Sequence, residues 1–145
     1  MLPQFTHRNP TLTYRLIILL SLGLITPLGF ASKSYQGVLA WWVNGYAGGA
    51  LYEVFWILLI LLVWPQASVF QTAFWVLIVT SLLEILQLWQ PPFMAEIRST
   101  FWWRMLFGNS FSWWDFPHYL LGCFASWICL EYTRAKIFLK KSSQN

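Results

Sequence analysis

The chain has 145 residues, of which 58% are hydrophobic, 20% are aromatic and only 10% are charged. A soluble domain carries about a quarter charged residues, and a single domain of this length could not bury so much apolar surface. The composition therefore excludes an ordinary soluble domain and favours one membrane domain over residues 1–145, with an exterior solvated by lipid. The net charge of +4 does not indicate nucleic-acid binding, because the basic residues form no single patch.

Four apolar stretches come close to the roughly 20 residues that a helix needs to cross the hydrocarbon core. They occupy residues 14–31, 47–64, 67–89 and 113–132. Pro65 separates the second stretch from the third, which predicts a tight helical hairpin, and Pro91 and Pro92 stop the third. The fold class that we predict is an all-α integral membrane bundle of four transmembrane helices, followed by a basic C-terminal tail over 133–145.

The first stretch has a second interpretation. His7, Arg8 and Arg15 precede or open an apolar run that ends near Gly29 and Ala31, and this order is also typical of a signal peptide with its cleavage site. We favour an uncleaved helix, because a membrane bundle can use it for packing. The sequence leaves both interpretations open.

Orientation follows from the Lys and Arg residues that flank the spans. With four spans, the N-terminus, the Pro65 turn and the C-terminus share one side, which holds Arg8, Arg15, Arg134, Lys136, Lys140 and Lys141. The other side holds Lys33, Arg98 and Arg104. The excess on the first side predicts that both termini are cytoplasmic.

The segment between the third and fourth stretches is too apolar for a free loop and too short and charged for another span. We predict an interfacial or re-entrant segment whose tryptophans lie at headgroup depth. Arg98 and Arg104 in this segment would reach back to carboxylates in the bundle, because the guanidinium group pairs with carboxylate or phosphate in bidentate fashion.

Ionisable residues inside spans are costly and need a partner or a hydrated pocket. Glu53, Glu84 and Asp115 are predicted to lie at about the same depth, near the outer interface. Thr80, Glu84 and Gln87 recur at i, i+4 and i+7, which places them on one helix face. Lys33 or an arginine could neutralise Glu53.

A second stripe of polar and small residues is predicted on the fourth helix. It consists of Asp115, His118, Gly122, Ser126 and Cys129. Small residues let helix backbones approach and polar ones bond across the contact, so both stripes should face the bundle interior. A metal at His118 would need further ligands, and no His or Cys pair has ligand spacing. We therefore predict a structural histidine and no metal or cofactor.

Several motifs resemble a family of small bacterial membrane proteins that is catalogued only as a domain of unknown function. The resemblance covers about residues 44–126 and includes Glu-x-x-Gln at Glu84, Arg-x-Thr at Arg98 and the segment that starts at Phe111. More loosely, the order of these elements resembles the VanZ-like family. The resemblance implies a bacterial plasma membrane and site positions at Glu84, Gln87, Arg98, Thr100, Gly108, Asp115 and Gly122. The family tends to have glycine where this chain has Trp103, so the local geometry there should differ.

Two functions remain open for the polar cluster, whose candidate members are Glu53, Glu84, Gln87, Arg98, Thr100, Arg104, Asp115 and His118. In the first, the cluster stabilises the bundle and contacts a lipid headgroup, a membrane protein partner or a second copy of the chain. In the second, the protein is a small enzyme or carrier that acts on a lipid-linked or anionic substrate at the outer face. Enzymatic activity and catalytic residues are left open.

Overall fold

A computed structural model describes residues 9–89, 91–100 and 111–142. Its elements are α1 (Pro10–Ser32), α2 (Ala40–Trp42), a π-helical turn η1 (Val43–Ala47), α3 (Gly48–Val63), α4 (Val69–Leu86), α5 (Pro92–Ser99) and α7 (Asp115–Ser142). No strand occurs in these residues. The predicted all-α fold is therefore confirmed for the part of the chain that the structure describes.

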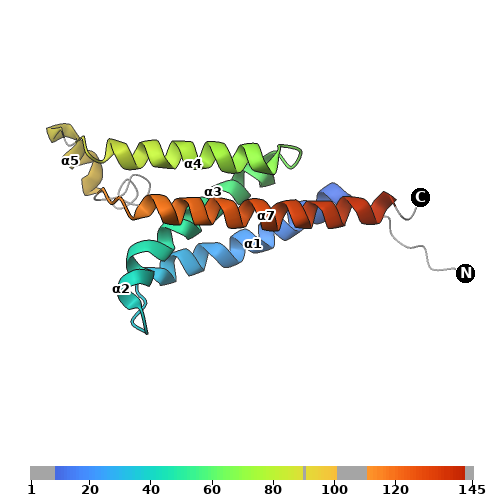
Figure 1. Ribbon diagram of the computed structural model, residues 1–145, viewed down its shortest axis with the longest axis horizontal. Coiled ribbons are helices and arrows are strands. Elements are labelled where there is room, and N and C mark those ends of the chain that lie inside the picture. Colours follow the sequence, from blue (N-terminus) through green and yellow to red (C-terminus); the bar gives the residue numbers. More distant parts are fainter. Residues whose placement is uncertain (1–8, 90, 101–110, 143–145) are drawn as a thin grey trace, which may run out of the picture.

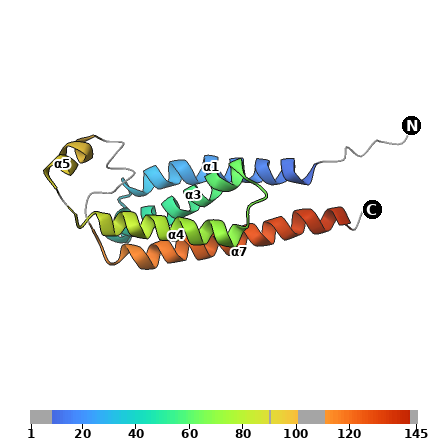
Figure 2. The same cartoon turned by 90° about the horizontal axis from the view of Figure 1, so that it is seen from above.

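The four long helices α1, α3, α4 and α7 lie side by side along one direction (Figures 1 and 2). α3 and α7 form the centre, because each of them packs against all the other long helices. The start of α1 and the end of α7 lie at one end of the bundle, here called the termini end, and the turn between α3 and α4 points the same way. α2 and α5 lie at the opposite end, here called the α2 end.

Three helical segments are long and apolar enough to cross a membrane, namely Pro10–Ser32, Ala40–Val63 and Val69–Leu86. Much of their outer surface consists of exposed large side chains, such as Leu20 and Trp75. An outer surface of this kind suits lipid and not water. The chain therefore has the helices of a multi-pass membrane protein. The fourth predicted span, 113–132, lies in the more polar α7, which is not among the three, so it stays a prediction.

The second apolar segment begins earlier than predicted. The predicted stretch begins at residue 47, but the helical segment starts at Ala40 and passes through the π-helical turn Val43–Ala47. A π-helical turn takes up an extra residue without interrupting the helix. Consequently Glu53 lies near the middle of the segment Ala40–Val63, further from its start than predicted, and its depth in the membrane stays a prediction.

The C-terminal region also differs from the prediction, because α7 continues as a helix to Ser142 where we expected a tail from residue 133. No Gly or Pro occurs between Thr133 and Ser142, and Arg, Lys, Ala and Leu are strong helix formers. α7 also has a tertiary anchor there. The Arg134 guanidinium donates to the backbone oxygen of Ala67 at 2.7 Å and to that of Gln66 at 3.4 Å.

A second arginine supports the same turn from α1. Arg15 donates to the backbone oxygen of Val63, at the end of α3, at 3.3 Å. The last carbonyl groups of a helix lack partners within the helix, and they attract cations. The termini end is thus held by two arginines, from α1 and α7, that satisfy backbone oxygens around the turn between α3 and α4.

The apolar core joins α1 to α3 and extends to α4 and α7. The buried residues of the core are Tyr14, Ile18, Leu22, Ile57, Leu58, Leu61, Val69, Ala73, Val76, Cys123 and Leu130. On α1 the members of the core recur at i, i+4 and i+8. This spacing puts one face of α1 against its neighbours and leaves the rest of its surface to lipid.

α3 and α7 approach each other closely at two glycines. A Cβ on Gly122 would lie 2.5 Å from the backbone oxygen of Ala50, and one on Gly49 would lie 3.0 Å from the ring of Tyr119. Only glycine permits this distance between helix backbones at Gly122. The contact brings the polar face of α7 directly against α3.

Candidate functional site

Polar side chains follow one face of α7 into the bundle. Asp115, Tyr119, Cys123 and Ser126 are spaced by four, four and three residues, so they share a face. Cys123 and Ser126 are buried, and Tyr119 is partly buried. These four residues of α7, with Glu84 of α4 and Glu53 of α3, form a set of six that is called the polar ladder below.

Glu84 is the best-satisfied carboxylate of the ladder. Its side chain is 2% exposed. Oε1 accepts from the backbone N–H of Ser112 at 2.8 Å, and Oε2 accepts from Gln87 Nε2 at 2.7 Å and from the Tyr119 hydroxyl at 3.0 Å. Hydrogen bonds to an ionised acceptor are stronger than neutral ones. Glu84 therefore ties the end of α4 to α7 and to the residues that precede α7.

Glu53 lies about one helical turn deeper, where α3, α4 and α7 meet. Its side chain has no exposed surface. Cys123 Sγ donates to Oε2 at 3.2 Å, and the Thr80 hydroxyl lies beside the carboxyl group. The other oxygen, Oε1, has no hydrogen-bond partner among the described residues.

Asp115 is the first residue of α7 and lies at the rim of the ladder. It lies close enough to Glu84, Lys33 and His118 to interact with them electrostatically. The Lys33 ammonium donates to the backbone oxygen of Asn44 at 3.3 Å. Lys33 therefore acts on Asp115 at the rim.

His118 joins α7 to α2 and η1. Its Nε2 accepts from the indole N–H of Trp42 at 3.1 Å, so Nδ1 carries the proton of the neutral ring and donates to the backbone oxygen of Trp114 at 2.6 Å. The ring also stacks on Tyr46, with the centroids 4.9 Å apart. Both ring nitrogens are engaged, which suits a structural role.

Three buried acceptor atoms in this half of the bundle have no partner among the described residues. They are Asn44 Oδ1, Glu53 Oε1 and Gln87 Oε1. A buried acceptor without a donor costs about 1–3 kcal/mol. All three atoms would be satisfied by a group that brings N–H or O–H donors.

The predicted site residues divide into three groups. Glu53, Glu84, Gln87, Asp115 and His118 lie in or around the ladder. Thr100 is exposed in the bend after α5. The side chain of Arg98 and all of Arg104 lie outside the described residues, as do Trp103 and Gly108, so the expected arginine–carboxylate pairs stay a prediction.

The structure corrects one member of the stripe predicted on α7. Gly122 and Ser126 face the interior, but Cys129 is exposed, so its predicted place on the inner stripe is wrong. Tyr119 and Cys123 were missed, although they follow Asp115 at i+4 and i+8. The spacing can be read from the sequence, but Tyr119 and Cys123 do not stand out as polar residues in a segment that has many aromatic and apolar residues.

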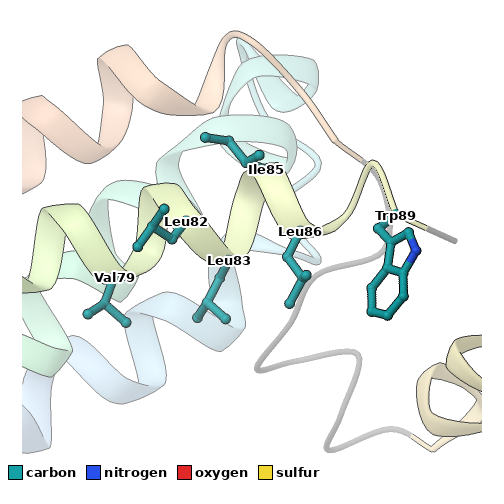
Figure 3. Close-up of a pocket in the computed structure, with 6 residues that line it drawn as sticks. All are labelled: Val79, Leu82, Leu83, Ile85, Leu86 and Trp89. Carbon is teal, nitrogen blue, oxygen red and sulfur yellow. The ribbon is translucent and has the colours of Figure 1, made fainter.

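A hollow of about 530 Å³ lies on the outer face of α4 (Figure 3). It is lined by Val79, Leu82, Leu83, Ile85, Leu86 and Trp89. Its lining is apolar and comes from one helix and the residues after it, so it resembles a lipid-facing surface and holds no group for chemistry. Among the described residues, no group of three or more His, Cys, Asp or Glu side chains could hold a metal ion.

What the ladder offers chemically is a line of carboxyl, phenol, thiol and hydroxyl groups that runs from the rim toward the middle of the bundle. Such groups can bind cations, donate and accept hydrogen bonds, and pass protons.

Comparison with known proteins identifies the family of the chain. No curated protein and no solved structure matches the chain. A family model matches more than half of the chain, from α2 to the first third of α7, and this region includes both glutamates of the ladder, Asp115, Tyr119 and Cys123. The predicted resemblance to a domain of unknown function is thereby confirmed. The chain belongs to the family described as Protein of unknown function (DUF2809), whose model matches residues 38–123.

Proposed function

We propose that this protein binds the headgroup of an amine-bearing phospholipid at the α2 end of the bundle. The observation that carries the proposal is the surplus of acceptors there. Asp115 lies at the rim, and the buried oxygens Asn44 Oδ1 and Gln87 Oε1 lack donors among the described residues. A primary ammonium group has three N–H donors and a positive charge, which complement a carboxylate and neutral acceptors.

The rim also offers a cation for the phosphate of the same headgroup. Lys33 lies near Asp115, and its ammonium group makes one described hydrogen bond, of 3.3 Å, to a backbone oxygen. An ammonium group has three donors, so it can bind a phosphate oxygen as well. Arg98 and Arg104, for which we predicted this role, would add to it.

In this proposal the carboxylates have separate roles. Glu84 already accepts three hydrogen bonds, so it stabilises the bundle. Asp115 is only half-buried and begins its helix, so it is the carboxylate that contacts the ligand. The looser likeness to the VanZ-like family stays a prediction and carries no part of this assignment. The alternative function as an enzyme or carrier also stays a prediction, because no observation favours it.

The membrane placement is part of the proposal. We propose that α7 is the fourth span, because it packs along α3 and α4 and has exposed apolar side chains such as Leu121 and Ile128 on its outer side. We further propose that both termini are cytoplasmic in a bacterial plasma membrane, because the termini end carries the excess of Lys and Arg. The α2 end and α5 then lie at the outer interface.

Reporter fusions test this placement. A reporter that is active only in the cytoplasm should be active when it is inserted after Pro65. A reporter that is active only outside the cytoplasm should be active when it is inserted near Ser99. An exported reporter that is active after Pro65 would contradict the orientation.

Lipid retention tests the headgroup. The purified full-length protein in mild detergent is mixed with phosphatidylethanolamine or with phosphatidylcholine of the same acyl chains, and bound lipid is counted by native mass spectrometry. We expect retention of the ethanolamine lipid only, because the trimethylated nitrogen of choline has no N–H donor. Asp115→Asn should lose the retained lipid, whereas Glu131→Gln, a change at an exposed carboxyl of α7, should keep it. Equal retention of the two lipids would overturn the proposal.

A further inference from the structure

The buried carboxyl group of Glu53 has no role in the headgroup site. It lies near the middle of the segment Ala40–Val63 and has no exposed surface. Cys123 donates to one of its oxygens at 3.2 Å, and the neighbouring Thr80 hydroxyl gives its proton to the backbone oxygen of Val76 at 2.9 Å. Oε1 has no partner among the described residues.

Among the residues that the structure describes, the groups that face Glu53 bring no positive charge. α7 contributes Tyr119 and Cys123, α4 contributes Thr80, and α3 itself contributes Tyr52. These side chains are neutral at neutral pH. The other charged neighbours along the ladder are Glu84 of α4 and Asp115 of α7, which interact with the same Tyr119 and are also acidic. Lys33, from the end of α1, acts on Asp115 at the rim.

An ionised carboxylate without a counter-charge in an apolar interior costs several kcal/mol. Binding a proton removes that charge and leaves a neutral carboxyl group, which can donate as well as accept a hydrogen bond. Nothing else in the described surroundings of Glu53 offers a comparable way to remove the cost.

The ladder connects this carboxyl group to the α2 end. From the rim inward, Asp115 is followed one turn later by Tyr119 with Glu84, at 3.0 Å, and one turn after that by Cys123 with Glu53. Ser126, one turn deeper and 5% exposed, has a hydroxyl group without a partner among the described residues. Each step carries a group that can exchange a proton.

We propose that Glu53 is a proton-binding site inside the membrane: its carboxyl group carries a proton at neutral pH and exchanges that proton with the α2 end through the polar ladder. The proposal goes beyond headgroup binding and does not depend on it, because no lipid takes part in the exchange.

Infrared spectroscopy tests the site directly, because the chain has only five acidic residues. The full-length protein in a detergent without carbonyl groups, at neutral pH, should show the carbonyl band of one protonated carboxylic acid. The band should shift when H₂O is replaced by D₂O, disappear in Glu53→Gln and persist in Glu131→Gln. Tyr119→Phe should keep the band but slow its shift in D₂O at least several-fold, because one step of the ladder is lost.

Three results would overturn the proposal. They are the absence of such a band in the wild-type protein, a band that persists in Glu53→Gln, and a band that does not respond to D₂O. Replacing choline chloride by sodium chloride should leave the band unchanged, and its loss would show that the site binds a metal cation instead. If Glu53→Gln does not fold, Glu53→Asp should retain a deuterium-sensitive band at a shifted frequency. Lipid retention is measured separately, so either proposal can fail while the other stands.

Discussion

The two ends of the bundle hold their helices together by opposite means. At the termini end, Arg15 and Arg134 donate to backbone oxygens around the turn between α3 and α4, at 3.3 Å and 2.7 Å. At the α2 end, buried carboxyl groups accept from side chains and from one backbone N–H. Arg15 uses an acceptor that every helix C-terminus supplies, and Arg134 uses backbone oxygens of the turn itself. At the α2 end, in contrast, buried oxygens of Asn44, Glu53 and Gln87 lack donors among the described residues, and we propose that a ligand supplies donors there.

The largest effect on stability is expected at Glu84, in the polar ladder at the α2 end. Glu84→Gln replaces one acceptor oxygen by an amide NH₂ group, which would face donors from Gln87, Tyr119 or Ser112. We expect a loss of about 3 kcal/mol in the free energy of unfolding, since bonds to a charged acceptor are lost and a donor is left unpaired. The thermal unfolding midpoint in detergent micelles measures this, with Glu131→Gln as the control that should change little. Equal midpoints for the two variants would show that the hydrogen bonds of Glu84 do not hold the helices together at the α2 end.

The next effect concerns the close contact between the two central helices. Gly122→Ala puts a Cβ only 2.5 Å from the backbone oxygen of Ala50, so α3 and α7 must separate. We expect a net loss of about 1–2 kcal/mol despite the better helix propensity of alanine. The same substitution at Gly23, in the interior of α1 with no atom within 4 Å of the new Cβ, should raise the unfolding midpoint. A Gly122→Ala protein as stable as Gly23→Ala would show that the helices are less tightly packed than described.

The two arginines of the termini end should differ from each other. Arg134→Gln removes bonds to two backbone oxygens and should lower the free energy of unfolding by about 1 kcal/mol. Arg15→Gln removes one long bond at an exposed site, so we expect a loss of only a few tenths of a kcal/mol. Thermal unfolding of both variants in one detergent ranks them, and a larger loss for Arg15→Gln would contradict the ranking.

The smallest change within the ladder is Tyr119→Phe. It removes one hydroxyl donor from Glu84, which keeps its bonds to Ser112 and Gln87. A loss of about 1 kcal/mol or less is expected. Because the phenyl ring keeps the packing against Gly49, a loss as large as that of Glu84→Gln would mean that the hydroxyl group organises the whole end.

The sequence predicts the all-α class, the hairpin at Pro65 and the three apolar segments, because long apolar stretches and proline positions determine them. It also predicts the buried stripe of Thr80, Glu84 and Gln87 from spacing alone. The position of Glu53 within its helical segment could not be predicted, because a π-helical turn through Gly45 cannot be distinguished from a loop by composition. The bond between Cys123 and Glu53 depends on how α3 and α7 are rotated toward each other, and periodicity leaves two neighbouring faces of α7 nearly equivalent.

Headgroup stabilisation tests most directly whether the acceptor surplus at the α2 end serves a ligand. The unfolding midpoint is measured for the wild-type protein in micelles doped with phosphatidylethanolamine or, at equal concentration, phosphatidylcholine. A ligand that binds only the folded state stabilises it by about 2.7 kcal/mol at 100 times its dissociation constant, so we predict a higher midpoint with the ethanolamine lipid. The difference should vanish in Asp115→Asn and remain in Glu131→Gln. The same midpoint in both lipids, or a difference that survives in Asp115→Asn, would contradict the account.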